Sequence, residues 1–167
     1  MLTAFLSRSQ RRIPQFASSL YIPRNAIMPK YISNDELAEL MKTEGKVAGK
    51  DYLVVDVRDE DFAGGNITNA RNIPSREFSV AVYDLAQKLK EVEVMVFHCA
   101  LSQARGPKAA RIYEETRQNL NIPAEYGPQE VLILRGGFTE FQRKFGTDPT
   151  LVEKWDPEVW EGAEEWS

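Results

Sequence analysis

The stretch that most constrains this chain is residues 94–107, which read VMVFHCALSQARGP. Its first four residues are apolar and include β-branched and aromatic types, which is typical of a buried strand. The run leads into His98 and Cys99, the only histidine and the only cysteine of the 167 residues. Arg105 follows after five further residues, and Pro107 suits the first turn of a helix. The stretch therefore predicts a strand, a loop and a helix, with a thiol where the loop begins and a guanidinium where it ends.

A loop of this composition can bind an oxyanion. If residues 99–105 curl before the helix, their backbone N–H groups converge, and the positive end of the helix dipole adds to them. Arg105 can hold two oxygens of the anion through its planar guanidinium. The same positive field favours the ionised, nucleophilic form of Cys99. We therefore predict that Cys99 is a catalytic nucleophile and that Arg105 binds the oxyanion. We expect His98 to orient the loop through a hydrogen bond to the backbone, without acting as a general base.

Each of these residues has a plainer interpretation when taken alone. A single cysteine at the end of a strand usually belongs to the hydrophobic core. A single arginine usually lies at the surface. The spacing of Cys99 and Arg105 across a junction between a strand and a helix is what favours catalysis over these interpretations.

The composition excludes several other kinds of site. A net charge of −4 gives no indication of a nucleic-acid partner. One cysteine allows no internal disulfide and no thiolate cluster for zinc, and one histidine excludes the common multi-histidine metal sites. No apolar run is long enough to span a membrane. We therefore expect a protein without a metal or a bound cofactor.

Apolar strands alternate with helical stretches, which predicts an α/β fold with a central, mainly parallel sheet flanked by helices. The active site of such a sheet lies at the carboxyl ends of the strands, where Cys99 falls. Ser33 and Glu36 form a capping-box pattern that predicts the start of the first helix. The predicted strands are residues 52–58, 70–74, 94–97 and 131–134, and the predicted helices are residues 33–42, 79–92, 108–119 and 138–145. The apolar residues of the amphipathic helix 79–92 are Val80, Val82, Tyr83, Leu85, Ala86 and Leu89.

Residues 1–30 differ from the rest of the chain. They contain five basic residues and no acidic one, interspersed with serine and apolar residues. This composition is typical of a mitochondrial presequence, although a basic tail without such a role is the alternative. Initiation at Met28 would give a cytoplasmic or nuclear form. We expect a basic extension at residues 1–30, a catalytic domain at 31–146 and an acidic tail at 147–167.

The predicted tail holds Trp155, Trp160 and Trp166. These tryptophans either pack back on the domain or form a docking segment for a partner. The sequence does not separate the two interpretations, and packing is the favoured one.

The loop sequence HCALSQARGP resembles that of the rhodanese-fold Cys phosphatases, the family of the cell-division-cycle dual-specificity phosphatases. It is still more similar to the small plant and fungal members, some of which are arsenate reductases. Asp56 with Arg58, the Gly-Gly pair at 64–65 and the Arg-Gly-Gly-Phe turn at 135–138 also resemble family markers, whereas Asn66 stands where histidine is common. The resemblance implies a rhodanese-like single domain with Cys99 as nucleophile. It implies a cradle made by the backbone amides of Ala100, Leu101, Ser102, Gln103, Ala104 and Arg105, with His98, Asp56 and Arg58 in supporting roles.

The resemblance implies hydrolysis of phosphate esters through a phosphocysteine, with a phosphorylated protein or a small oxyanion as substrate. The cell-cycle members carry glutamates in this loop, where the present chain has Ala100 and Ala104. A phosphatase gains from an acid that protonates the leaving oxygen. Asp59, Glu60 or Asp61 can supply this acid only if their loop folds over the pocket.

In rhodanese folds the turn at 135–138 lies at the catalytic end of the sheet, so the resemblance implies that Arg135 adds positive potential there.

Arsenate reduction is the alternative activity, because arsenate has the shape and charge of phosphate. It needs a second thiol, which the chain lacks, so glutathione or glutaredoxin would act as the external reductant and partner. A non-catalytic oxyanion-binding module and a thiosulfate sulfurtransferase are less favoured. True rhodanese sulfurtransferases usually have a loop one residue shorter than the loop from Cys99 to Arg105.

Overall fold

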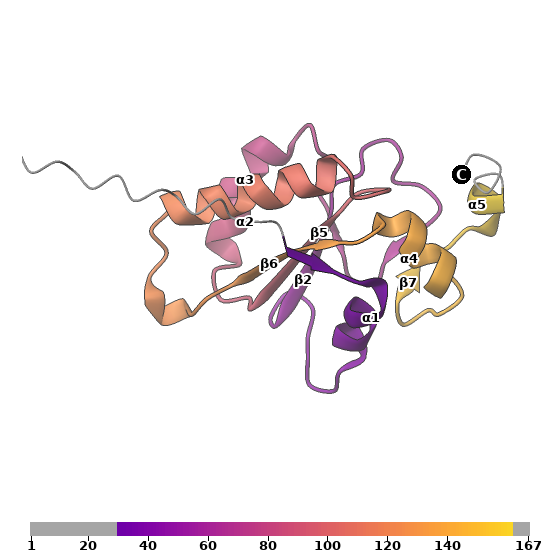
Figure 1. Cartoon of the computed structure of the whole chain (residues 1–167), viewed down its shortest axis with the longest axis horizontal. Coiled ribbons are helices and arrows are strands. Elements are labelled where there is room, and N and C mark those ends of the chain that lie inside the picture. Colours follow the sequence, from indigo (N-terminus) through magenta and orange to yellow (C-terminus); the bar gives the residue numbers. More distant parts are fainter. Residues whose placement is uncertain (1–29, 162–167) are drawn as a thin grey trace, which may run out of the picture.

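The computed structural model describes residues 30–161, and Figure 1 shows how the helices and strands are arranged. The strands are β1 (Lys30–Ile32), β2 (Tyr52–Asp56), β3 (Asn66–Ile67), β4 (Arg71–Asn72), β5 (Val94–His98), β6 (Glu130–Leu134) and β7 (Val152–Glu153). The helices are α1 (Asn34–Lys42), α2 (Phe78–Lys88), α3 (Arg105–Asn119), α4 (Gly137–Phe145) and α5 (Pro157–Glu161), with a 3₁₀ turn at Ala124–Tyr126. The extension predicted at residues 1–30 lies outside the described residues except for Lys30. Within residues 30–161, no helix is long and apolar enough to cross a membrane.

Five parallel strands form the central sheet, in the order β1-β6-β5-β2-β4. The mainly parallel sheet predicted from the sequence is confirmed. The two central strands β2 and β5 pair along their whole length, with Asp56 opposite His98 at the end. Because all five strands run in the same direction, their carboxyl ends lie at one edge of the sheet. The loop that follows His98 therefore starts at this edge.

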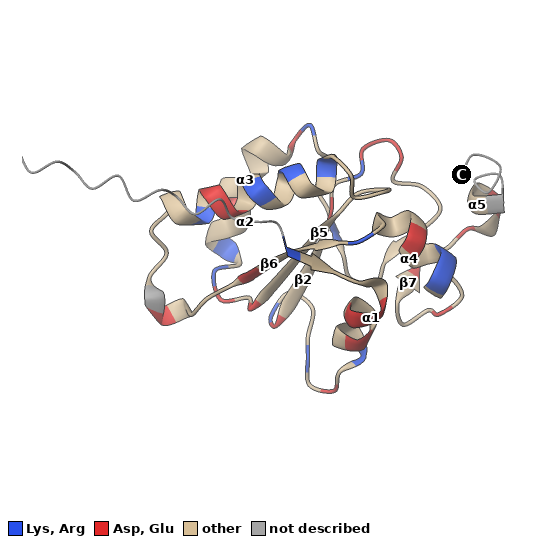
Figure 2. Ribbon diagram, in the orientation of Figure 1, with Lys and Arg blue, Asp and Glu red and all other residues tan. Residues whose placement is uncertain are grey.

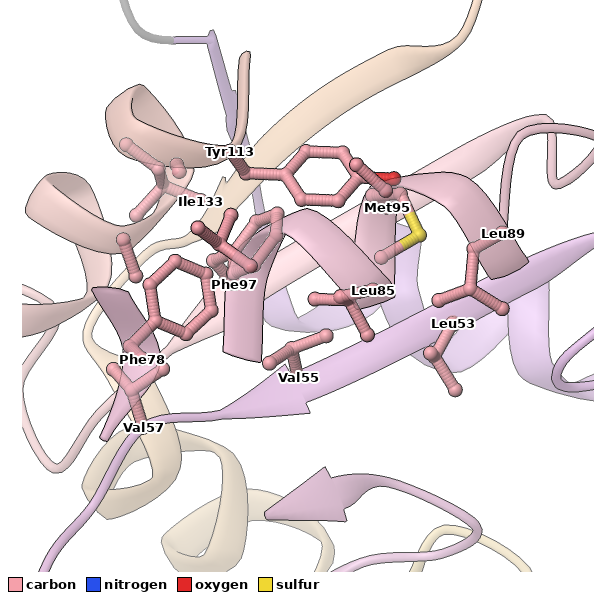
Figure 3. Close-up of a cluster of buried hydrophobic side chains, with 14 of the residues drawn as sticks. Leu53, Val55, Val57, Phe78, Leu85, Leu89, Met95, Phe97, Tyr113 and Ile133 are labelled. Atoms are coloured by element: carbon pink, nitrogen blue, oxygen red, sulfur yellow. The ribbon is translucent and has the colours of Figure 1, made fainter. Parts of the chain in front are cut away.

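Side chains alternate between the two faces of the sheet, and each face packs against its own helices. Leu53, Val55 and Phe97 face α2 and α3, and Figure 3 shows their side chains meeting those of the two helices. Val54 and Val96 face the opposite side, which α1 and α4 cover in Figure 1. The apolar runs of β2 and β5 are therefore buried on both faces, as a doubly covered parallel sheet requires.

Helix α1 begins where the sequence predicted. The hydroxyl of Ser33 accepts a hydrogen bond from the amide of Glu36 (3.2 Å), and the carboxylate of Glu36 accepts one from the amide of Ser33 (2.8 Å). This reciprocal pair confirms the capping box and satisfies two backbone donors at the helix start.

Helix α2 is shorter and more one-sided than predicted. It ends at Lys88 and not at residue 92, because Leu89 leaves the helical conformation (φ −109°, ψ 23°). Val80 and Tyr83 are 87% and 56% exposed, although the prediction placed them in the apolar set of this helix. The helical period puts them off the buried stripe. That stripe consists of Phe78, Val82, Leu85 and Ala86.

The chain after residue 146 packs as part of the domain up to residue 161. Strand β7 pairs antiparallel with β3. The indole of Trp155 donates to the side-chain oxygen of Gln142 (3.1 Å), and the indole of Trp160 donates to the carbonyl oxygen of Gly64 (2.7 Å). Both tryptophans therefore pack on the domain, which was the favoured interpretation of the predicted tail. Trp166 lies outside the described residues.

Candidate active site

The loop between β5 and α3 is short and curled. It comprises residues 99–104, since β5 ends at His98 and α3 begins at Arg105. Ser102 has a left-handed conformation (φ 51°), which is uncommon for a residue other than glycine and bends the chain back toward the helix. Helix α3 begins three residues before the predicted start, so Arg105 is its first residue. The predicted order of strand, loop and helix is confirmed.

The N-terminus of α4 orients the loop backbone. The amides of Phe138 and Thr139 donate to the carbonyl oxygens of Cys99 and Ala100, both at 3.0 Å. The carbonyl and N–H of a trans peptide point in opposite directions, so the N–H groups of Ala100 and Leu101 point away from α4. Among residues 30–161, no protein acceptor is found for the amides of residues 100–104. The predicted cradle therefore has several backbone donors available for an oxyanion.

Gly137 allows the loop and α4 to approach each other this closely. It has a φ of +60°, and a Cβ placed there would lie 2.5 Å from the carbonyl oxygen of Cys99. Such a distance is far inside van der Waals contact, and the left-handed backbone itself favours glycine. The Gly-Gly pair after β6 thus has a structural reason: it is where the turn touches the candidate catalytic loop.

Replacing Gly137 with alanine is expected to lower kcat/KM by about 10²-fold, because a displacement of about 1 Å at a reacting group costs that much. The added methyl group must push the carbonyls of Cys99 and Ala100 away. Gly49→Ala is the matched control, since Gly49 also has a positive φ (+82°) but has nothing within 4 Å of its Cβ position. The check is kcat/KM and melting temperature for both variants. Equal losses of activity would show that backbone strain alone, and not the loop contact, is responsible.

Arg105 reaches from the first turn of α3 to the loop that follows β2. Its Nη1 and Nη2 donate to the two carboxylate oxygens of Asp61 (2.7 and 2.6 Å), and Nη1 also donates to Asp59 (3.0 Å). Figure 2 shows the red acidic residues of this loop close to the blue residues at the start of α3. The hydrogen bond with Asp61 is the main cause that raises the pKa of Arg105, and attraction to Cys99 adds to it. Cys99 is 4% exposed and belongs to the apolar cluster between the sheet and helices α2 and α3, so it also has the buried position of the plainer interpretation. Arg105 keeps a third of its side chain exposed.

Of the acidic residues 59–61, Asp59 and Asp61 contact Arg105 and are held in their ionised form. Hydrogen bonds from Arg105 lower the pKa of Asp61 to about 2. Partial burial works to raise the pKa of Asp59, but hydrogen bonds, one of them from Arg105, outweigh it and lower the pKa. Glu60 pairs with Arg76. Prediction from sequence named these residues only as potential acids and missed their contact with Arg105. The available signal was a run of three acids directly after the Asp-x-Arg marker.

A buried ion pair supports the loop of residues 57–65 between β2 and β3, which carries these acids and is called the acidic loop below. Arg58, only 1% exposed, donates through Nε and Nη2 to the carboxylate of Asp56 at 2.8–3.1 Å. Its guanidinium lies over the ring of Phe138, with 4.2 Å from Cζ to the ring centre. It also donates to three backbone carbonyl oxygens of the loop, those of Asp61, Ala63 and Gly65. These contacts tie the end of β2 to the loop that follows, which agrees with the supporting role that the resemblance implies for Asp56 and Arg58.

His98 is completely buried beside this ion pair. Its Nδ1 lies 3.2 Å from the carbonyl oxygen of Cys99, and its Nε2 lies 3.6 Å from a carboxylate oxygen of Asp56. Burial lowers the pKa of His98, and attraction to Asp56 opposes this only in part. The imidazole is therefore neutral at physiological pH, and it contacts the backbone of the loop as the sequence interpretation expected.

The free energy of unfolding is expected to fall as the pH is lowered below about 6.5, the ordinary pKa of histidine. The unfolded chain binds a proton at His98 there, whereas the folded chain, whose pKa at this residue is lowered, does not. Stability is thus fully present above the unfolded pKa and declines below it, with a limiting slope of about 1.4 kcal/mol per pH unit for one proton. Urea unfolding between pH 7.5 and 5.5, compared between the wild-type chain and Glu114→Gln, measures the contribution of His98, the only histidine, because burial raises the pKa of Glu114 and acts in the opposite direction. A flat profile, or an imidazole NMR titration at an ordinary pKa, would contradict this.

Other predicted features lie away from the loop. The guanidinium of Arg135 lies over the ring of Tyr31, with 5.1 Å from Cζ to the ring centre, and its predicted contribution to the site has no direct contact to support it. The side-chain amide of Asn66, at the position of the common family histidine, donates to the carboxylate of Glu153 in β7 (2.7 Å).

In the described part of the chain, no group of three or more His, Cys, Asp or Glu side chains is arranged to hold a metal ion.

Comparison with known proteins identifies relatives that share this architecture. Residues 33–144 match the family of rhodanese-like domains. The chain is 31% identical over 142 residues to the dual specificity phosphatase ibp1 of Schizosaccharomyces pombe, an alignment that covers 74% of this chain and 95% of that protein.

Two solved structures extend the comparison. A yeast protein tyrosine phosphatase of the rhodanese family has a TM-score of 0.62 and 28% identity, covering 78% of this chain and 96% of that one. The As-Sb reductase of Leishmania major has a TM-score of 0.65 and 29% identity, covering 83% of this chain and 99% of that one. The chain is thus similar both to phosphatases and to a reductase of arsenic and antimony.

Proposed function

Since this chain belongs to the family of rhodanese-like domains, we propose that it is a Cys-dependent phosphatase of the protein-tyrosine or dual-specificity type. The observation that carries the proposal is the loop of residues 99–104. Its amides are available for an oxyanion, Cys99 stands at its start, and Arg105 stands at its end. Relatives named as phosphatases support the same chemistry.

In the first step, the thiolate of Cys99 attacks phosphorus. The bond between sulfur and phosphorus forms, the ester bond between phosphorus and oxygen breaks, and its electron pair leaves with the ester oxygen. The loop amides and Arg105 stabilise the charge on the three equatorial oxygens, and such electrostatic stabilisation usually contributes most to the catalysis of phosphoryl transfer. In the second step, water attacks phosphorus, the bond to sulfur breaks, and inorganic phosphate leaves as the thiolate is regenerated.

The protonation state of the nearby acids affects which phosphate esters the site can hydrolyse. Protonation of a leaving oxygen by a positioned acid is worth about 10²–10⁴-fold. The loop itself has Ala100 and Ala104 where such an acid could stand. Hydrogen bonds from Arg105 lower the pKa of Asp61, and hydrogen bonds from Ser75 and Arg105 lower that of Asp59, so both are ionised. Phenolate leaves without protonation more readily than an alkoxide does. The site therefore fits aryl phosphates such as phosphotyrosine better than alkyl phosphates.

Arsenate reduction is the second candidate function, favoured by the similarity to the Leishmania As-Sb reductase. Reduction of arsenate to arsenite requires two electrons. Cys99 would supply one sulfur and glutathione the other, so that arsenite and water leave and a mixed disulfide remains on Cys99. Glutaredoxin and a further glutathione would then reduce that disulfide. An external thiol is required because the chain has no second cysteine.

Parallel assays of the purified protein test both functions. One assay uses p-nitrophenyl phosphate, and the other uses arsenate with glutathione and glutaredoxin. We expect turnover of the phosphate ester, lost in Cys99→Ser. Turnover of arsenate alone would establish the second function in its place. Binding of inorganic phosphate with turnover of neither substrate would contradict both and indicate a non-catalytic oxyanion-binding module.

A further inference from the structure

Arg105 makes contacts that oxyanion binding alone would not require. A guanidinium has five N–H donors, arranged as an end fork between Nη1 and Nη2 and a side fork between Nε and Nη2. Asp61 occupies the end fork, with Nη1 to Oδ1 at 2.7 Å and Nη2 to Oδ2 at 2.6 Å. Asp59 accepts the other N–H of Nη1 at 3.0 Å. Three of the five donors are therefore taken by carboxylates of the acidic loop.

The side fork of Arg105 differs from the end fork in its hydrogen bonding. Its Nε–H and the second N–H of Nη2 donate to no acceptor among residues 30–161. Two parallel N–H groups are what a tetrahedral oxyanion needs for bidentate binding. The guanidinium can thus hold an oxyanion on one edge while its other edge stays bound to Asp61.

The two carboxylates are themselves fixed in place. Oδ1 of Asp61 accepts a hydrogen bond from the amide of Asp59 (2.9 Å), and Oδ2 of Asp59 accepts one from the hydroxyl of Ser75 (2.8 Å). The buried Arg58 donates to the backbone carbonyl of Gly65 in the same loop at 2.8 Å. The acidic loop is therefore hydrogen-bonded both to the end of β2 and to the segment before α2.

We propose that Asp61, assisted by Asp59, is the positioning residue for Arg105. It holds the end fork so that the side fork faces the oxyanion bound by the loop amides. The inference rests on the proposed function, because it concerns the same oxyanion site. A long side chain held in its bound geometry has already lost its rotamer freedom, so binding and transition-state stabilisation do not have to supply that entropy. Asp61 acts through Arg105 and does not need to touch the substrate.

The test is Asp61→Asn in the full chain, with p-nitrophenyl phosphate as substrate. We expect kcat/KM to fall about threefold to tenfold, mainly through kcat, since the freed guanidinium must be ordered again in the transition state. Asp35→Asn is the matched control, because it breaks a surface ion pair with Lys144 (2.5 Å), contributed by α1 and α4. The control should leave kcat/KM unchanged. Asp59→Asn should give a smaller loss in the same direction.

A double-mutant cycle separates positioning from a merely structural role. In an Arg105→Lys background, Asp61→Asn should cost little further activity, because the residue through which it acts is already gone. The same loss in both backgrounds would overturn the proposal. The affinity for inorganic phosphate, measured calorimetrically in a Cys99→Ser background, should also weaken about threefold to tenfold on Asp61→Asn.

Two other results would also overturn the proposal. Higher kcat/KM and tighter phosphate binding in Asp61→Asn would show that Asp61 competes with the substrate for Arg105. A loss confined to alkyl phosphates, with aryl phosphates unaffected, would show that Asp61 is a proton donor. If no phosphate ester is turned over, the proposed function fails. The phosphate affinities in the Cys99→Ser background still decide whether Asp61 positions Arg105.

Discussion

Replacing Cys99 with serine is expected to lower kcat by about 10⁴-fold or more, which is the scale of loss seen when an enzyme loses its nucleophile. A serine hydroxyl is not ionised at neutral pH and is a weak nucleophile without an adjacent general base. The only nearby imidazole, that of His98, is buried and contacts the backbone instead. The measurement is the steady-state rate with p-nitrophenyl phosphate, for the wild-type chain and the variant.

Phosphate binding by the same variant shows whether its loop is still folded. The loop backbone is held by hydrogen bonds from α4 to the carbonyl oxygens of Cys99 and Ala100, and a change from sulfur to oxygen leaves these contacts intact. Cys99→Ser should therefore still bind inorganic phosphate, at least as tightly as the wild-type chain, because the variant lacks the negative charge of the thiolate. Substantial residual turnover in the serine variant would contradict the assignment of Cys99 as the nucleophile.

Replacing Arg58 with methionine is expected to reduce the free energy of unfolding by about 3–5 kcal/mol, the cost of leaving a buried ion-pair partner uncompensated. The carboxylate of Asp56 has no exposed surface and would lose its paired cation. Three loop carbonyls would also lose the guanidinium that donates to them. Because this loop carries Asp61, activity should fall as well as stability. Urea unfolding gives the first quantity, and kcat/KM of the folded variant gives the second.

Two further variants test whether the loss of stability comes from the buried ion pair. Arg111→Met on the exposed face of α3 removes an arginine that is not buried, and its effect should stay within about 0.5 kcal/mol. The double variant Asp56→Leu with Arg58→Met should be more stable than Arg58→Met alone, because no unpaired buried charge remains. An Arg58→Met chain as stable as Arg111→Met would show that the buried pair does not anchor the loop.

The elements that could be predicted from the sequence are those set by local patterns. The apolar runs of β2 and β5 need no information beyond their own residues, and the capping box of Ser33 and Glu36 is likewise local. The strand–loop–helix order around Cys99 follows from one short run of consecutive residues. These features are decided by burial and by backbone hydrogen bonding within a few residues.

The remaining features depend on contacts between distant segments. The position of Asp61 on Arg105 requires the loop after β2 to lie against α3, and Arg58 and Trp160 hold this loop from two sides. The run of three acids after Arg58 shows where the charges are, but it does not show which distant residue they contact. Helix α2 was predicted too long because apolar residues continue past Lys88. Leu89 is buried, but its backbone is in a turn and no longer in the helix.

Chemical trapping of the intermediate tests the central claim most directly. The wild-type enzyme is mixed rapidly with an aryl phosphate, quenched in acid during turnover, digested and analysed by mass spectrometry. A phosphoryl group on the peptide that contains Cys99, absent when the substrate is omitted and absent from Cys99→Ser, is the predicted result. Turnover that proceeds with no phosphoryl group on this peptide, or with the group on a different residue, would contradict the account.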